Sequence, residues 1–113
     1  MITNKKPFKK LIETISEKKS ENITLYHIQK STYIADFFLI LTANNYIHVK
    51  SVAESIKSLY KSQNEEVILT GESKSEWILI DTSEIIIHVT TQAIREKYDL
   101  DNFYKQDSIV YHY

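Results

Sequence analysis

The chain has 113 residues and a formal net charge of −1; 42% of its residues are hydrophobic and 26% are charged. This length suits one domain spanning residues 1–113, and the composition excludes a chain that is disordered throughout. No uncharged apolar run approaches the roughly eighteen residues of a membrane span, the Lys-rich start does not resemble a secretory signal, and there are no cysteines, so we expect a cytoplasmic protein without disulfides.

The spacing of apolar residues predicts both helices and strands. The stripe that follows Pro7 has helical period, whereas the near-continuous apolar run over 36–42 suits a central strand covered on both faces. The expected elements are a helix over 5–19, strands over 23–28 and 36–42, a helix over 49–61, strands over 66–70, 77–81 and 84–89, and a helix over 93–98. This order predicts an α/β fold of the mixed α+β kind, with a single central mixed sheet of about five strands flanked by helices.

The residue types needed for several kinds of chemistry are missing. One glycine, Gly71, is too few for a dinucleotide fingerprint or a phosphate-binding loop. The four histidines lack metal-ligand spacing and are interpreted as structural or surface residues. Asp36 has no neighbouring carboxylate for a two-metal nucleotidyl-transfer site, and no nucleophile elbow is present. We therefore expect no enzyme, no cofactor and no metal.

The two β-rich runs of residues 77–81 and 84–89 are separated by two residues, which predicts a tight hairpin. With Thr82-Ser83 as its turn, Asp81 would lie opposite Glu84, and Trp77 opposite His88. One hairpin face would be entirely aliphatic and belong to the core: Ile78, Ile80, Ile85, Ile87 and Val89. The other face would be mixed: Trp77, Leu79, Asp81, Glu84, Ile86 and His88.

The mixed face has two interpretations. In the structural one, Trp77 and Ile86 lie under a helix, and the carboxylates sit at a solvated turn. In the functional one, opposed carboxylates, which are destabilising as a cross-strand pair, are kept because an aromatic anchor beside an acidic rim binds a partner.

Charge is distributed unevenly along the chain. Residues 1–30 hold seven lysines against three glutamates, a balance of +4, and the rest holds seven basic against twelve acidic groups, a balance of −5. The asymmetry arises either by chance in solvated faces or because the acidic part meets a basic partner. It argues against nucleic acid as the main contact.

These residues also resemble a known family. Trp77-Ile-Leu-Ile-Asp81 followed by Glu84-Ile-Ile-Ile-His88-Val89 closely resembles the Trp-x-x-x-Asp and Asp-x-x-x-His-Val pattern of the ribosome silencing factor (Iojap-related) family. Further similar segments occur in the same order: Ser31 to Asp36, His48-Val49, Thr70-Gly71-Glu72, and Arg95-x-x-Tyr98-x-Leu100. The resemblance covers about residues 5–105.

The resemblance implies a nucleotidyltransferase-like fold without catalytic residues, and a non-enzymatic function. Members of the ribosome silencing factor family bind the large (50S) ribosomal subunit through ribosomal protein fourteen and block association with the small subunit, which represses translation when nutrients are short. They are also found as homodimers. Two alternatives stay open: a large-subunit assembly factor, and a nucleotidyltransferase that retained activity.

We predict a partner-binding set of Trp77, Asp81, Glu84, His88, Arg95 and Tyr98. Arg95 has an alternative intramolecular role, tying the last helix to the hairpin acids, and His88 has one as a packing neighbour of Trp77. The sequence departs from the family pattern at Ser83 and Glu84, where Gly-Asp is usual, at Thr90, where a large apolar residue is usual, and at Tyr104, where Trp is usual. These departures affect the contact geometry more than the function.

Overall fold

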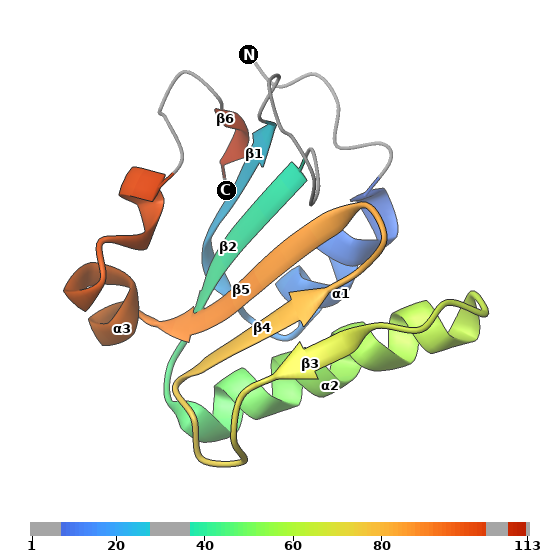
Figure 1. Ribbon diagram of the computed structural model, residues 1–113, viewed down its shortest axis with the longest axis horizontal. Helices are drawn as coiled ribbons and strands as arrows, with labels where there is room; N and C mark the ends of the chain where they lie inside the picture. Colours follow the sequence, from blue (N-terminus) through green and yellow to red (C-terminus); the bar gives the residue numbers. More distant parts are fainter. Residues whose placement is uncertain (1–7, 28–36, 104–108, 113) are drawn as a thin grey trace.

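Six strands form one mixed sheet within residues 8–27, 37–103 and 109–112, which the computed structural model describes, in the order β3-β4-β5-β2-β1-β6 (Figure 1). β2 and β5 pair in parallel, and the other neighbouring strands pair antiparallel. The elements in chain order are α1 (Lys9–Glu17), β1 (Glu21–His27), β2 (Phe37–Ala43), α2 (Tyr46–Ser62), β3 (Ile68–Thr70), β4 (Trp77–Asp81), β5 (Ile85–Thr91), α3 (Gln92–Lys97), the 3-10 helix η2 (Leu100–Phe103) and β6 (Ile109–His112).

The predicted fold class, a mixed sheet flanked by helices, is confirmed. The sheet has one strand more than the expected five, because β6 from the C-terminal tail pairs with the edge strand β1. The first residues of the predicted helix over 5–19, together with Ile28 and Asp36, lie outside the described residues.

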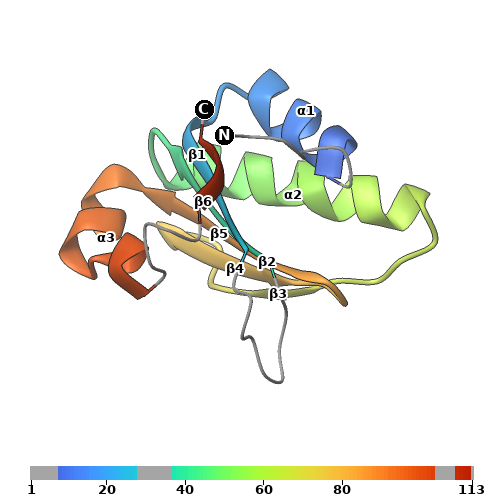
Figure 2. The same cartoon turned by 90° about the horizontal axis from the view of Figure 1, so that it is seen from above.

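One face of the sheet is covered by α1 and α2, which lie together on the same side (Figure 2). Each helix turns one apolar stripe inward: Leu11, Ile12 and Ile15 in α1, and Val49, Val52, Ala53, Ile56 and Tyr60 in α2. The aliphatic hairpin face packs against them, so its predicted place in the core is confirmed. Full burial of one such aliphatic side chain stabilises the fold by about 1.5–3 kcal/mol.

His48 joins the two covering helices. α2 begins after Asn45, whose side-chain oxygen accepts a hydrogen bond from the His48 backbone N–H at 2.9 Å. The His48 ring accepts at Nδ1 from the Asn44 N–H, and its Nε2 lies 2.6 Å from the Lys18 carbonyl just after α1. Because a carbonyl only accepts, Nε2 carries the proton. The start of α2 is thereby bonded to the end of α1.

The described residues cover only part of the opposite face of the sheet. Among the described elements, α3 and η2 pack over one end of it, where Leu100 joins Tyr26 and Ile40 in a second, smaller apolar cluster. Phe38 and Trp77 are partly buried beside that cluster. We call the uncovered part, beginning at Trp77 and continuing over β4 and β3, the open face.

Two neighbouring threonines on this side of the sheet differ in their hydrogen bonding. Thr42 of β2 and Thr90 of β5 are cross-strand partners, and both are buried. Thr42 Oγ1 accepts a hydrogen bond from Arg95 Nη1 at 3.0 Å. Thr90 Oγ1 has no hydrogen-bond partner among the described residues. A buried hydroxyl without a partner loses its hydration uncompensated.

We expect Thr90→Val, which keeps the shape and removes this hydroxyl, to raise the free energy of unfolding by about 1 kcal/mol. Thr42→Val is the matched control and should lower it by a similar amount, because an Arg95 N–H would lose its acceptor. Urea denaturation of the three proteins measures both changes. Equal destabilisation by the two substitutions would contradict the assignment of Thr90.

Candidate partner-binding face

The register of the hairpin differs from the predicted one. Asp81 lies opposite Ile86, Leu79 opposite His88, and Trp77 opposite Thr90. The predicted pairings of Asp81 with Glu84 and of Trp77 with His88 are therefore wrong. The turn lies one residue later than predicted, at Ser83-Glu84, and this moves every partner by two residues. Because side chains alternate with period two, the predicted faces of the residues within the two strands survive this error, whereas that of Glu84, which now lies in the turn, does not.

Thr82 explains the position of the turn. Its buried hydroxyl donates to the Ile85 carbonyl at 2.8 Å and accepts from the backbone N–H groups of Glu84 and Ile85. The Thr82 N–H also donates to the Ile85 carbonyl, at 3.1 Å. Thr82 thus pairs with Ile85, and its side chain bonds the backbone groups of the turn. Sequence reasoning missed this because it placed Thr82 inside the turn.

The two hairpin carboxylates do not form one acidic pair. Asp81 is partly exposed on the open face, between its cross-strand partners Ile86 and Ile68. Glu84 is exposed at the hairpin tip and lines a groove with Tyr60 and the start of α1. Burial, followed by the charges of Glu84 and Glu65, raises the pKa of Tyr60 to about 12. Glu84 therefore belongs to the helical side, and Asp81 to the open face.

Trp77, His88 and Tyr98 form an aromatic cluster at the boundary between the open face and α3. Trp77 Nε1 donates a hydrogen bond to His88 Nδ1 at 3.1 Å, and the Trp77 and Tyr98 ring centroids are 5.3 Å apart. The Tyr98 side chain is 48% exposed, whereas Trp77 and His88 are partly buried. The alternative in which His88 packs against Trp77 is the arrangement found, although the two are not direct cross-strand partners.

His88 is neutral in the folded protein. Burial, with a smaller contribution from the Arg95 charge, lowers the pKa of His88 to about 4. The Trp77 indole N–H is a donor only, so His88 Nδ1 must be unprotonated to accept from it. Protonating Nδ1 would remove this hydrogen bond and place a charge in a partly buried site.

Arg95 has an intramolecular role. Its side chain is 7% exposed and forms an ion pair with Asp101 of η2, with Nε 2.7 Å from Oδ2. Burial alone would raise the pKa of Asp101, but hydrogen bonds from Arg95 and Tyr26 outweigh it, and the pKa lies below its ordinary value. The intramolecular alternative thus describes Arg95, but its partner is Asp101 and not the hairpin acids Asp81 and Glu84.

Two exposed apolar residues near the predicted set were missed. Ile68 of β3 is 66% exposed and lies beside Asp81 on the open face, and Phe103 of η2 is 71% exposed. Short β3 gave too little alternation to assign a face to Ile68, and Phe103 belongs to a tail whose structure the sequence left uncertain.

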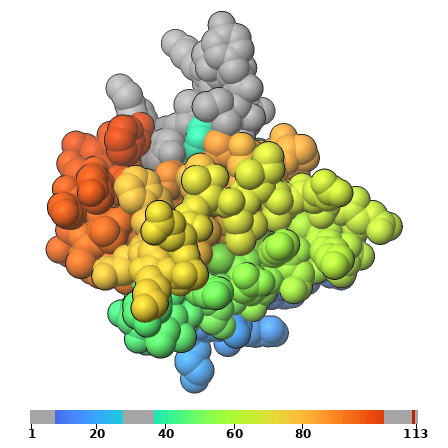
Figure 3. All heavy atoms as spheres, turned by 60° about the horizontal axis from the view of Figure 1, so that its bottom comes forward, coloured from blue at the N-terminus to red at the C-terminus, as the bar shows by residue number. Residues whose placement is uncertain are grey.

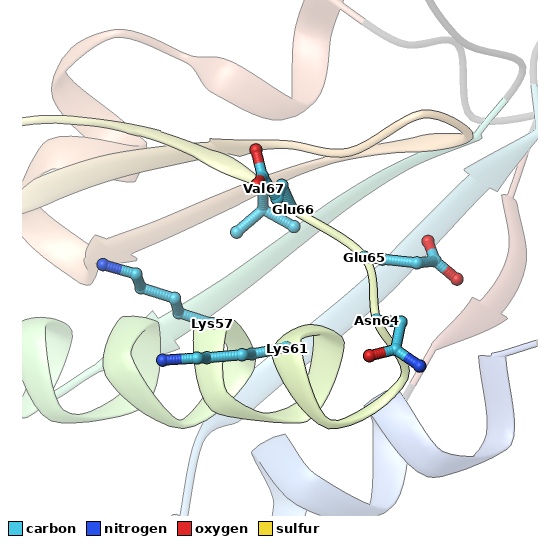
Figure 4. Close-up of a pocket in the computed structure, with 6 residues that line it drawn as sticks. All are labelled: Lys57, Lys61, Asn64, Glu65, Glu66 and Val67. Carbon is cyan, nitrogen blue, oxygen red and sulfur yellow. The ribbon is translucent and has the colours of Figure 1, made fainter.

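Another groove lies between α2 and the segment leading to β3 (Figure 3). It is lined by Lys57, Lys61, Asn64, Glu65, Glu66 and Val67 (Figure 4). Two lysines and two glutamates give it no net charge, so its electrostatics favour neither an anion nor a cation. None of the six predicted residues lines it.

Within residues 8–27, 37–103 and 109–112, no group of three or more His, Cys, Asp or Glu residues has the geometry to hold a metal ion. Within the same ranges, no helix has both the length and the apolar character needed to cross a membrane.

The pKa of His88 predicts a pH dependence of stability. Between pH 6.5 and 4, His88 is protonated in the unfolded chain but stays neutral in the folded chain. The free energy of unfolding therefore falls as pH falls through this window. Over this window we expect the free energy of unfolding of wild type to fall by on the order of 2 kcal/mol more than that of His88→Gln. The glutamine amide oxygen can still accept the hydrogen bond from Trp77. Urea denaturation at several pH values measures the difference, and other histidines cancel in it. Parallel curves for the two proteins would contradict the prediction.

Comparison with known proteins places the chain in a family. Residues 2–111 match the family model described as ribosomal silencing factor during starvation. The ribosomal silencing factor of Halalkalibacterium halodurans is 27% identical over 104 residues, covering 91% of this chain and 89% of that protein. The chloroplastic protein Iojap of Zea mays is 24% identical over 94 residues, covering 83% of this chain and 41% of that longer protein.

Solved structures show the same fold. A crystal structure of a protein from Chromobacterium violaceum matches with a TM-score of 0.80 at 24% identity, covering 90% of this chain and 87% of that one. A second, from Bacillus halodurans, matches with a TM-score of 0.77 at 25% identity, covering 89% and 95%. The relatives are named as silencing factors, not as enzymes. Since the family model matches nearly the whole length, the chain belongs to the ribosomal silencing factor family.

Proposed function

We propose that this chain binds the large ribosomal subunit through ribosomal protein fourteen and blocks its association with the small subunit, repressing translation when nutrients are short. Family membership supports the ribosome as target, and the family description names starvation as the condition. The observation that carries the proposal is the open face. β4 joins the aromatic cluster, with its half-exposed Tyr98, at one end to Asp81 and its cross-strand partner Ile68 at the other.

The open face has the composition of a protein-binding surface for a basic partner. Aromatic side chains provide contact area at a small entropic cost, and interfaces are enriched in them. Asp81 supplies a carboxylate that pairs with a lysine or arginine of the partner. Tyr98 and Ile68 supply exposed apolar area on either side. The proposed contact set is Ile68, Trp77, Asp81, His88, Tyr98 and Phe103.

This set adds Ile68 and Phe103 to the one predicted from sequence and leaves out Arg95 and Glu84. Arg95 is buried and bonded internally, so it has no exposed group to offer a partner. Glu84 lies on the helical side of the hairpin tip, near Tyr60. Both are left out of the contact set.

Silencing by this chain is steric. Binding energy is used to occupy a surface that the small subunit needs, and no covalent bond forms or breaks. Silencing therefore depends on the fraction of large subunits that this protein occupies at its concentration in the starved cell.

The separation of Asp81 from Glu84 provides a matched test. We expect Asp81→Lys to weaken binding to isolated large subunits about tenfold, because a carboxylate contact becomes a repulsion. Glu84→Lys makes the same charge change 3 residues along the chain and should alter affinity less than about twofold. Gradient co-sedimentation measures both, and wild-type binding should weaken as salt rises.

A subunit-joining assay completes the test. Wild-type protein should lower the yield of joined ribosomes, and Asp81→Lys should restore it at the same concentration. Thermal unfolding of each variant checks that the fold is kept. Equal binding by wild type and both charge variants would refute the acidic contact, whereas failure of wild type to sediment with large subunits would refute the function.

A second function is favoured by one relative. A mouse protein named mitochondrial assembly of ribosomal large subunit protein 1 is 18% identical over 98 residues, covering 83% of this chain. An assembly factor uses a similar surface but acts before the subunit is complete. Its loss would make large-subunit precursors accumulate in growing cells, whereas loss of a silencing factor would leave subunit maturation normal and raise translation in starved cells.

A further inference from the structure

We infer that Arg95 is a positioning residue for partner binding: its buried guanidinium holds the turn between α3 and η2 and thereby sets Tyr98 against Trp77. The inference rests on the proposed function for its binding consequence. The dependence of the aromatic cluster on Arg95 rests on the hydrogen bonds of its guanidinium and on the contact between Tyr98 and Trp77.

Every N–H group of the Arg95 guanidinium is occupied within the chain. Arginine carries five such donors in a planar fork. Nε and Nη2 donate to the two Asp101 carboxylate oxygens at 2.7 and 2.9 Å. Nη1 donates to the Asn22 carbonyl and Thr42 Oγ1, and Nη2 also donates to Thr24 Oγ1. One side chain thus joins η2 to β1 and β2.

Arg95 replaces the apolar anchor that a docked helix normally has. α3 has six residues, too few for independent stability, and its one buried side chain is that of Arg95. Ile94 beside it is only partly buried, so the position of α3 on the sheet depends mainly on directional hydrogen bonds. These fix orientation more tightly than an apolar contact does, because each needs both a distance and an angle.

The turn after α3 is held at both ends. Arg95 lies before it, and Leu100 and Asp101 follow it, with Leu100 buried in the smaller apolar cluster and Asp101 accepting from Tyr26 Oη at 2.5 Å. Between the anchors, Asp99 has a φ of 50°, in the left-handed region where Asp is better tolerated than most residues. Tyr98 lies at this reversal.

The position of Tyr98 decides the shape of the aromatic cluster. Its ring is 5.3 Å from that of Trp77, which in turn donates to His88. If α3 shifted on the sheet, Tyr98 would move with it and uncover Trp77. A ligand-binding role for Arg95 is disfavoured, because its donors are already bonded even though it borders a surface hollow.

Arg95→Lys is the direct test. Lysine keeps the charge but presents three donors at one point, so it cannot bond Asp101 and both strands in the same geometry. The chain has one tryptophan, Trp77, so fluorescence reports on the cluster directly. In the free protein we expect Arg95→Lys to make Trp77 more accessible to acrylamide, and affinity for large subunits to fall about tenfold.

A double-substitution cycle separates positioning from a general loss of stability. In a Tyr98→Ala background, Arg95→Lys should weaken binding less than about twofold further, because the residue it positions is gone. In an Asp81→Lys background, Arg95→Lys should weaken binding about tenfold, as it does in the wild-type background. Thr24→Val, which removes one acceptor and keeps the ion pair, is the milder variant if Arg95→Lys does not unfold cooperatively.

The outcomes are distinct. The positioning role would be overturned if a folded Arg95→Lys protein kept the acrylamide quenching and the affinity of wild type. It would also be overturned if Arg95→Lys lowered affinity equally in the Tyr98→Ala and Asp81→Lys backgrounds. If wild type does not bind large subunits, the proposed function fails, and quenching in the free protein still decides whether Arg95 positions the cluster.

Discussion

The parallel pairing of β2 with β5 is the interaction on which the rest of the structure depends. These two strands occupy the middle of the sheet, and they join the hairpin half to the half formed by β1 and β6. Their alternation divides the side chains into an aliphatic set under α1 and α2 and a mixed set on the opposite face. Both described long helices lie on the same side, and on the other side α3 and η2 are the described helices that pack over one end of the sheet. That other face is where we propose that the partner binds.

The two faces are stabilised by different forces. The helical side is mainly apolar, and its burial supplies most of the folding free energy. The opposite side relies on a polar network of Arg95, Asp101, Tyr26 and two threonines. A buried charge gives little net stability, because desolvation offsets much of the attraction. What such a network provides is a defined orientation of α3, and hence of the aromatic cluster.

This division explains why the proposed binding face tolerates residues that a core would not. His88 stays neutral because it is partly buried and accepts from Trp77. Thr90 is buried without a described hydrogen-bond partner beside Thr42, which Arg95 uses. The Thr90 hydroxyl costs stability at any pH, whereas His88 does so only as pH falls below 6.5. Both residues adjoin the surface that the function is proposed to use, and unsatisfied groups often lie near functional sites.

The sequence by itself determined the fold class, the core face of the hairpin and the place of Trp77 and Asp81 on the other face. These follow from the periods of apolar residues, which are local properties of a helix or strand. It also indicated the family, through side chains in a fixed order along the chain. Only the tertiary structure decided the hairpin register, the separation of Glu84 from Asp81 and the internal role of Arg95. Each depends on where a hydrogen-bonding group finds its partner: Thr82 pairs with Ile85 across the turn, whereas Arg95 bonds residues 73 and 53 positions away. Such partners are chosen by three-dimensional proximity, which the spacing of residues along one strand or helix does not specify.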